Sequence, residues 1–259
     1  MKVGGGLNYV TGPMGSGKSL YGVRQIVRHL LAGNYVVTNV ELLPDALERI
    51  ARRSSRLTTG SAGRSRLEAR LRERYVFTTE LDHAMRHRLP GTGEARGLFV
   101  WDETHNDLNN RDWRKEGRDE ILKWATQLRK LGFVGYLLSQ HADNTDAALR
   151  RVCNFQVRLQ NQREQTRTLG IRITPWPLFL AVWMPTNTPL TKVGQPMKVE
   201  RYFLDWHRHL YDTHGVFHGV ENELGDDVIL LGTGAPQVHR PVKAALDTPS
   251  PSDAPLRVA

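Results

Sequence analysis

Apolar positions fall into short blocks along the first 160 residues, and the blocks switch between two spacings. Continuous apolar runs typical of buried strands cover residues 7–11, 35–40, 97–101 and 133–138. Apolar residues spaced three and four apart, as on one face of a helix, occur at 19–31 and 120–131. This alternation predicts an α/β fold with a mainly parallel central sheet flanked by helices.

After residue 160 the pattern becomes strand-like. Apolar or alternating runs at 170–174, 178–184 and 199–203 predict a small antiparallel β-extension of the main sheet. The stretch from residue 232 onward is rich in proline and is expected to be disordered or extended. The predicted organisation is a core at 1–160 with a basic insertion at 49–74, an extension at 161–231 and a tail at 232–259.

A glycine-rich loop joins the first predicted strand to the first predicted helix. It fits the pattern G-x-x-x-x-G-K-[ST], whose backbone N–H groups converge on phosphate at the start of a helix. In such a P-loop NTPase fold the lysine reaches the β- and γ-phosphates, and the hydroxyl binds Mg²⁺. The cofactors expected are therefore ATP and Mg²⁺. The predicted nucleotide contacts are Gly12, Pro13, Met14, Gly15, Ser16, Gly17, Lys18, Ser19 and Leu20.

Two adjacent carboxylates, Asp102 and Glu103, follow the apolar run 97–101. Open α/β sheets bind ligands at the carboxyl ends of their strands, and the pair is typical of a Walker B sequence. Asp102 would then hold Mg²⁺ together with Ser19, and Glu103 would act as general base on the attacking water. The alternative is a helix N-cap followed by an acid in the first turn. The phosphate loop upstream favours the catalytic interpretation.

Three further residues are candidates for catalysis. Gln140 follows the strand predicted at 133–138 and would either sense the γ-phosphate or only cap the strand. Arg150 and Arg151 are candidates for an arginine finger, which stabilises the transferring phosphoryl group, often from a neighbouring subunit. Ordinary surface arginines are the commoner case unless the protein forms a ring.

The composition of the chain indicates what kind of partner and compartment to expect. The chain has 259 residues, a net charge of +9 and a pI near 9.9, which favours contact with nucleic acid or an anionic membrane surface. Its single cysteine, Cys153, excludes an internal disulfide and fits a reducing cytoplasm. The longest apolar run, 178–184, is too short to cross a bilayer, so no transmembrane segment is expected.

Positive charge is densest between Arg49 and Arg74, where nine arginines face two glutamates. One interpretation is an insertion that contacts the phosphates of DNA or a membrane surface. The other is a solvated, partly disordered loop. Composition alone does not separate them.

Taken together, these stretches resemble the zonular occludens toxin (Zot-like) family, which includes the gene I assembly ATPases of filamentous phages and is similar to HerA/FtsK-type DNA motors. The phosphate loop and the Asp-Glu pair are generic to P-loop ATPases. The narrower signals are Thr38-Asn39-Val40, Ser139-Gln140-His141 and the segment 210–214. The resemblance covers about residues 7–214.

The resemblance implies an oligomeric ATPase, expected to form a ring, that drives extrusion or packaging of phage DNA at the host inner membrane. It maps nucleotide contacts onto Gly12 to Ser19, Mg²⁺ binding and hydrolysis onto Asp102 and Glu103, and a sensor onto Gln140. Filamentous-phage members usually have a membrane-spanning helix after the ATPase domain. Because no transmembrane segment is expected in this chain, we expect that a separate membrane or capsid protein docks it, or that it acts in the cytoplasm. The alternatives are a nucleotide-dependent assembly factor that is not a motor, and a small-molecule or nucleotide kinase.

Overall fold

The computed structural model describes the chain in ten stretches, all within the first of two compact units, Met1–His214. The stretches are 6–55, 60–89, 97–104, 118–140, 146–162, 167–168, 171–172, 178–186, 196–203 and 206–212. The predicted tail at 232–259 lies outside the described residues, as do His141 and residues 213–214. None of the described helices has the length and apolar character needed to span a bilayer.

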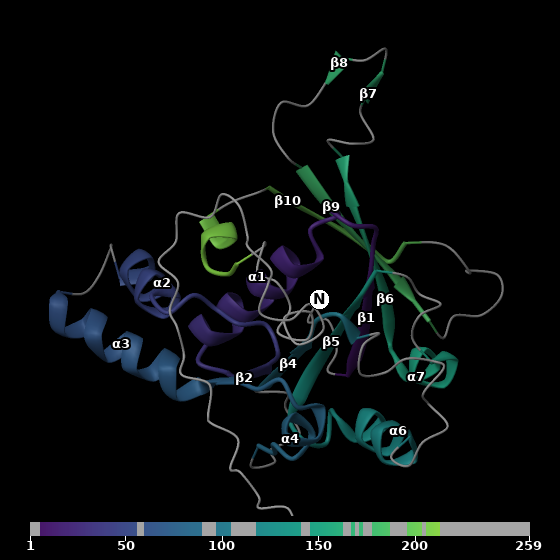
Figure 1. The fold of residues 1–259 in the computed structure, drawn as a ribbon, viewed down its shortest axis with the longest axis horizontal. Helices are drawn as coiled ribbons and strands as arrows, with labels where there is room; N and C mark the ends of the chain where they lie inside the picture. Colours follow the sequence, from purple (N-terminus) through teal and green to yellow (C-terminus); the bar gives the residue numbers. More distant parts are fainter. Residues whose placement is uncertain are drawn as a thin grey trace, which may run out of the picture. The chain divides into compact units, whose positions relative to one another are not determined.

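An eight-stranded sheet forms the centre of this unit, in the order β10-β9-β6-β1-β5-β4-β2-β3 (Figure 1). Its strands are β1 (Leu7–Thr11), β2 (Tyr35–Thr38), β3 (Tyr75–Phe77), β4 (Gly97–Trp101), β5 (Phe133–Ser139), β6 (Phe155–Asn161), β9 (Leu178–Pro185) and β10 (Lys198–Phe203). The strands from β3 to β6 along this order pair in parallel, and β9 and β10 are antiparallel. This confirms the predicted fold class, including its antiparallel extension.

The remaining pair, β7 (Arg167–Thr168) and β8 (Ile171–Arg172), forms a separate two-stranded ladder. Because β9 pairs directly with β6, the later strands continue the same sheet. The domain boundaries at 160 and 231 stay predictions.

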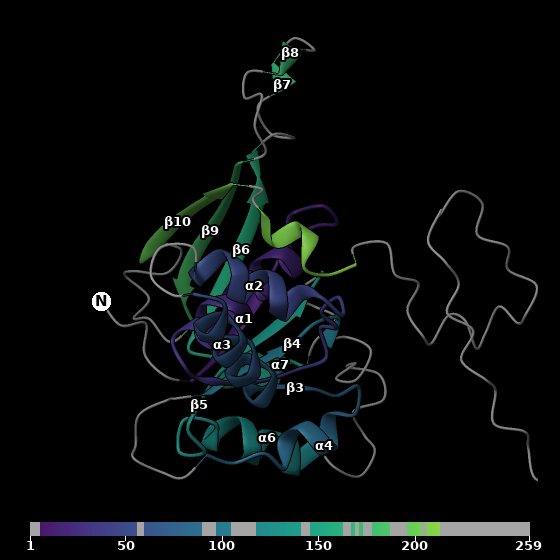
Figure 2. The same ribbon diagram turned by 90° about the vertical axis from the view of Figure 1, so that its left-hand side faces the viewer.

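Helices cover both faces of the sheet, because successive strand residues point to opposite sides. The helices are α1 (Lys18–Leu31), α2 (Ala46–Ser54), α3 (Ser61–Arg74), α4 (Leu81–Met85), α6 (Arg118–Gln127) and α7 (Ala147–Val152), with the 3₁₀ turn η4 (Trp206–His209). One hydrophobic cluster joins α1, α2, Leu71 of α3 and η4 to one face, and another joins α4, α6 and α7 to the other. Figure 2 shows α4 and α6 together below the sheet.

The basic stretch 49–74 is largely helical where it is described. α2 covers 49–54 and α3 covers 61–74, with Ser55 and Gly60 flanking residues 56–59, which lie outside the described residues. The loop interpretation is therefore wrong for the described part. The apolar pattern missed α3 because Leu71 is its only fully buried residue, so the helix has no apolar stripe.

Candidate nucleotide-binding site

The phosphate loop leaves the carboxyl end of β1 and ends in the first turn of α1. Gly15 and Gly17 have φ of 75° and 87°, in the left-handed region that side chains other than hydrogen disfavour. The carbonyl of Gly17 accepts the N–H of Tyr21 at 2.8 Å, so Gly17 caps the helix. The backbone is thus held in the curved form that presents N–H groups to an anion.

Lys18 folds back over this loop. Its Nζ donates to the carbonyl oxygens of Gly12 at 2.9 Å and of Pro13 at 3.2 Å. Burial lowers the pKa of Lys18, and the charges of Asp102 and Glu103 oppose that shift. The ammonium group therefore sits inside the loop, facing two carboxylates.

Residues from the far end of the unit form the walls of the loop. A Cβ on Gly17 would lie 2.8 Å from the ring of Phe179 in β9, and the hydroxyl of Tyr202 in β10 donates to the Gly17 carbonyl at 3.4 Å. The amide of Asn161, at the end of β6, donates to the carbonyl of Gly15 at 3.2 Å. The antiparallel extension is therefore structurally part of the loop.

The second half of the site lies at the end of β4. Ser19 Oγ donates to Asp102 Oδ2 at 2.7 Å, which joins the start of α1 to the end of β4. Asn39, after β2, fixes the backbone there: its Nδ2 donates to the Asp102 carbonyl at 2.9 Å, and its Oδ1 accepts the Asp102 N–H at 2.7 Å. Burial raises the pKa of Asp102, and the bonds from Ser19 and from the Glu103 N–H oppose the shift.

Glu103 has a backbone φ of 48°, the one positive φ of a non-glycine residue in the described part of the chain. Such a conformation costs free energy and persists where neighbouring contacts enforce it. Its N–H donates to Asp102 Oδ1 at 2.9 Å, and the next residue, Thr104, is fully buried with Oγ1 donating to the Leu138 carbonyl at 2.7 Å. The two carboxylates are thereby held at the edge of the sheet that bears the loop.

Tyr211 approaches this edge from the last described segment. It forms an isolated bridge with Leu42, and the Leu210 carbonyl accepts the N–H of Leu43. Burial raises the pKa of Tyr211 to about 12, and the negative charge of Asp102 adds to the shift. The phenol thus lies in the electrostatic field of the site.

Gln140 reaches the same edge. It follows β5, in which Ser139 lies opposite Thr11 of β1 and Leu137 lies opposite Trp101 of β4. Gln140 is therefore flanked by the strands that carry the loop and the carboxylates, and its sensor role stays a prediction.

Arg150 and Arg151 are placed differently. They occupy the last turn of α7, which leads into β6 at Phe155, and Phe155 lies opposite Asn8 at the amino end of β1. The loop lies beyond the carboxyl end of that strand (Figure 1). The structure does not bring the two arginines to the loop of their own chain, so a finger role would require a neighbouring subunit and stays a prediction.

These residues fit a nucleotide and a divalent cation by their chemistry. Ser16 Oγ is buried in the loop, and no hydrogen-bond partner for it is found among the described residues. A hydroxyl and a carboxylate, as in Ser19 and Asp102, are the oxygen donors that Mg²⁺ prefers. Lys18 supplies the positive charge that a triphosphate needs.

Sequence reasoning missed Asn39, Phe179 and Tyr202 as parts of the site. Asn39 had a signal, since it is a polar residue directly after a buried strand at the ligand-binding edge. No sequence signal marked Phe179 and Tyr202 as parts of the site, because an aromatic residue in a strand is typical of any core.

The similarity to known proteins covers the part of the chain that carries this site. The family model described as zonular occludens toxin (Zot) matches residues 7–179. The Gene 1 protein of Salmonella phage IKe is 30% identical over 124 residues, 48% of this chain and 31% of that protein. The Gene 1 protein of Enterobacteria phage fd is 28% identical over 142 residues, 55% of this chain and 38% of that protein. The match thus spans about a third of these relatives' length.

Among solved structures, the N-terminal domain of zonular occludens toxin from Neisseria meningitidis aligns with 80% of this chain and 99% of that domain. The sequence identity is 15% and the TM-score is 0.46.

Proposed function

Because the chain belongs to the zonular occludens toxin (Zot) family, we propose that it is a Mg²⁺-dependent ATP hydrolase that moves phage or mobile-element DNA during virion assembly. One contact carries the proposal: Ser19 Oγ lies 2.7 Å from Asp102 Oδ2. It joins the phosphate loop to the carboxylate that follows β4. A hydrolase needs these two groups together, because both serve one cation.

Each residue then has a separate task. Lys18 and the loop N–H groups hold the phosphates, and Ser19 and Asp102 hold the cation. A bound Mg²⁺ would neutralise charge on the phosphate oxygens as the terminal bond breaks. Glu103 would accept a proton from the attacking water, and Gln140 would orient that water. Asn39 keeps Asp102 in place through its two hydrogen bonds to the backbone.

The motor part of the proposal is supported by charge and by the relatives. The chain carries a net charge of +9, and arginines are concentrated on α2 and α3. Contacts from such helices would be to DNA phosphates. The matched relatives are proteins of Salmonella phage IKe and Enterobacteria phage fd.

We further propose a homo-oligomer, as a ring in which Arg150 or Arg151 reaches a neighbouring subunit's site. A separate membrane or capsid protein would dock the assembly in the cytoplasm or at the inner membrane. The alternative function is a nucleotide-dependent switch that recruits assembly partners without turnover. The strained backbone at Glu103 favours hydrolysis, since a switch needs no general base in that position.

The test is steady-state ATP hydrolysis with no nucleic acid, with single-stranded DNA and with double-stranded DNA. Glu103→Gln should lower the rate about a hundredfold or more, the usual contribution of a general base, while nucleotide still binds. Glu120→Gln makes the same chemical change on exposed α6 and should leave the rate unaltered. DNA should raise the wild-type rate. Equal turnover by wild type and Glu103→Gln would refute the assigned base, and binding without turnover in all three conditions would favour the switch.

A further inference from the structure

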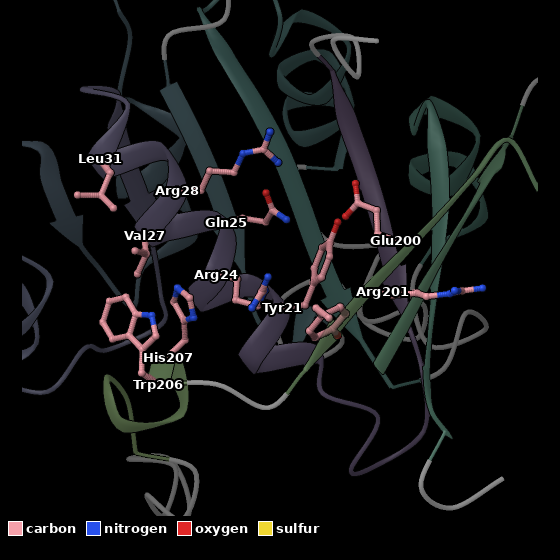
Figure 3. A pocket seen from close by; sticks show the side chains of 11 residues that line it. Tyr21, Arg24, Gln25, Val27, Arg28, Leu31, Glu200, Arg201, Trp206 and His207 are labelled. Carbon is pink, nitrogen blue, oxygen red and sulfur yellow. The ribbon is translucent and has the colours of Figure 1, made fainter. Parts of the chain in front are cut away.

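A groove of about 380 Å³ lies between α1 and β10, the edge strand of the sheet. Its walls are α1 from Tyr21 to Leu31, β10 and the 3₁₀ turn η4. In Figure 3, Trp206 and His207 rise from η4 toward α1, and Glu200 approaches Tyr21 from β10. The volume is within the range of sites that hold a small molecule.

The groove is positively charged. Arg24 and Arg28 lie one turn apart on α1, with the guanidinium of Arg24 5.0 Å from the ring centroid of Tyr202. Glu200 is the one acidic residue among the described residues that line it, and its carboxylate accepts a hydrogen bond from Lys198. An anionic ligand therefore meets two arginines and an acid whose charge is already compensated.

The opposite wall carries the rings of Trp206 and His207 from η4, and the guanidinium of Arg53 lies over the Trp206 ring. The rings of Trp206 and His207 are 4.4 Å apart between centroids and tilted by 30°. Val27 and Leu31 complete this wall from α1, and the largely buried Gln25 provides an amide. Inorganic phosphate alone would leave this wall unused, whereas a planar heterocycle would contact the ring edges and the side chains of Val27 and Leu31.

The turn η4 also connects the groove to the basic helices. The guanidinium of Arg53 in α2 lies 5.0 Å from the Trp206 ring centroid, and Arg49 Nη1 donates to the His209 carbonyl at 3.0 Å. Arg49 and Arg52 are paired with Asp45 and Glu48, so a chain of phosphates leaving the groove would first meet Arg53 of α2 and then the arginines of α3.

We propose that this groove is a second nucleotide-binding site, which takes a nucleoside phosphate with its phosphate at Arg24 and Arg28 and its base against Trp206 and His207. The unit can come from a nucleic-acid strand or from a free nucleotide. The continuation onto α2 favours the strand. In that form the inference deepens the proposed function, because the groove is where the motor holds one nucleotide of its DNA.

Two fluorescent probes separate the two sources. A fluorescein-labelled twelve-residue oligothymidylate reports strand binding by anisotropy in the full chain. AMP with an N-methylanthraniloyl group on the ribose reports free-nucleotide binding, measured in a Lys18→Ala background that removes the phosphate-loop site. The groove variants are Trp206→Ala and Arg28→Gln, of which the second changes an exposed side chain and spares the packing. The control is Arg129→Gln, an exposed arginine on the other face of the sheet.

If the groove holds a strand, Trp206→Ala should raise the Kd of the oligomer about tenfold, as expected when one aromatic contact with a base is lost. Arg28→Gln should flatten the slope of log Kd against log salt by about 0.7, the value for one phosphate contact on a single strand. If it holds free nucleotide, the AMP probe alone should lose affinity. Arg129→Gln should change neither probe.

Unchanged binding of both probes in both groove variants would overturn the proposal, as would equal losses in Arg129→Gln. The hydrolysis assay on the same proteins keeps the two hypotheses apart. If the groove proposal is wrong, ATP turnover still depends on Glu103. If the motor proposal is wrong, binding of the oligomer still depends on Trp206.

Discussion

Individual side chains at the ends of β2 and β4 show how the site is fixed. Asn39 makes both of its hydrogen bonds to the backbone of Asp102, so the side chain of Asp102 remains available to Ser19. The sequence allowed Ser19, Asp102 and Glu103 to be proposed because each belongs to a local pattern. It did not predict the contact between Asn39 and Asp102, because the two residues are 63 positions apart.

His29 gives a prediction at this scale. Burial, with a smaller effect from Arg28, lowers its pKa from 6.5 to about 4. Its Nδ1 lies 3.2 Å from Asn34 Nδ2, so the neutral ring accepts the amide proton. Between pH 6.5 and 4 the unfolded chain binds a proton that the folded chain does not. The free energy of unfolding should therefore fall with decreasing pH, by on the order of 2 kcal/mol after allowance for partial exposure.

Urea unfolding at several pH values measures this loss, and His29→Gln provides the comparison because glutamine cannot take up the proton. The variant should lose less stability than wild type across the same interval. The same pH dependence in both proteins would contradict the assignment to His29.

At the scale of elements, the strand, loop and helix from Leu7 to Leu31 were predictable, because the loop sequence and the apolar spacing are local signals. α3 was not, because it buries little apart from Leu71 and is stabilised at its surface by pairs such as Arg72 with Glu68, 2.8 Å apart. The packing of β9 and β10 on the loop could not be predicted from the sequence either, because it depends on tertiary contacts.

Gly17 tests that packing. Its φ of 87° disfavours any side chain, and an added Cβ would meet the Phe179 ring at 2.8 Å. Gly17→Ala should lower the free energy of unfolding by at least about 1–2 kcal/mol, the cost of a left-handed backbone in an L-residue, and should weaken ATP binding. Phe179→Leu in the same chain should restore part of the stability by relieving the contact.

Gly60→Ala serves as the matched control, since a Cβ there meets open space and the backbone φ is −64°. Its unfolding curve should overlay that of the wild type. A Gly17→Ala protein as stable as Gly60→Ala would show that the contact with Phe179 is absent in solution.

For the molecule as a whole, the alternation of strands and helices was enough to predict the fold class. The strand order was not predictable. β1 lies between β5 and β6, which begin 126 and 148 positions after Leu7. This order makes neighbours of β1, β5 and β4, the strands that lead to the loop, Gln140 and Asp102.

The distribution of charge over the molecule predicts how it holds DNA. Arg66 and Arg70 are exposed and four residues apart on α3, so they share a face. Replacing both with glutamine should flatten the slope of log Kd against log salt for DNA by about 0.7 to 0.9 per lost phosphate contact. Anisotropy titrations at several salt concentrations measure the slope.

Arg129→Gln with Lys130→Gln removes the same charge from exposed positions on the opposite layer. This pair should leave both the affinity and the slope unchanged. Equal slopes for all three proteins would exclude α3 from the DNA-binding surface.

The walls of the phosphate loop also set the order in which a growing chain acquires its site. The loop at residues 12–19 is among the first parts to leave the ribosome. Its partners are synthesised much later: Asn161 follows Gly15 by 146 residues, and Tyr202 follows Gly17 by 185 residues. At ordinary rates of synthesis that interval is roughly ten to forty seconds. During it, the loop is complete in sequence but lacks its walls. We therefore expect a nascent chain to acquire nucleotide binding only after β10 has emerged, at nearly the same moment as the groove that β10 also lines.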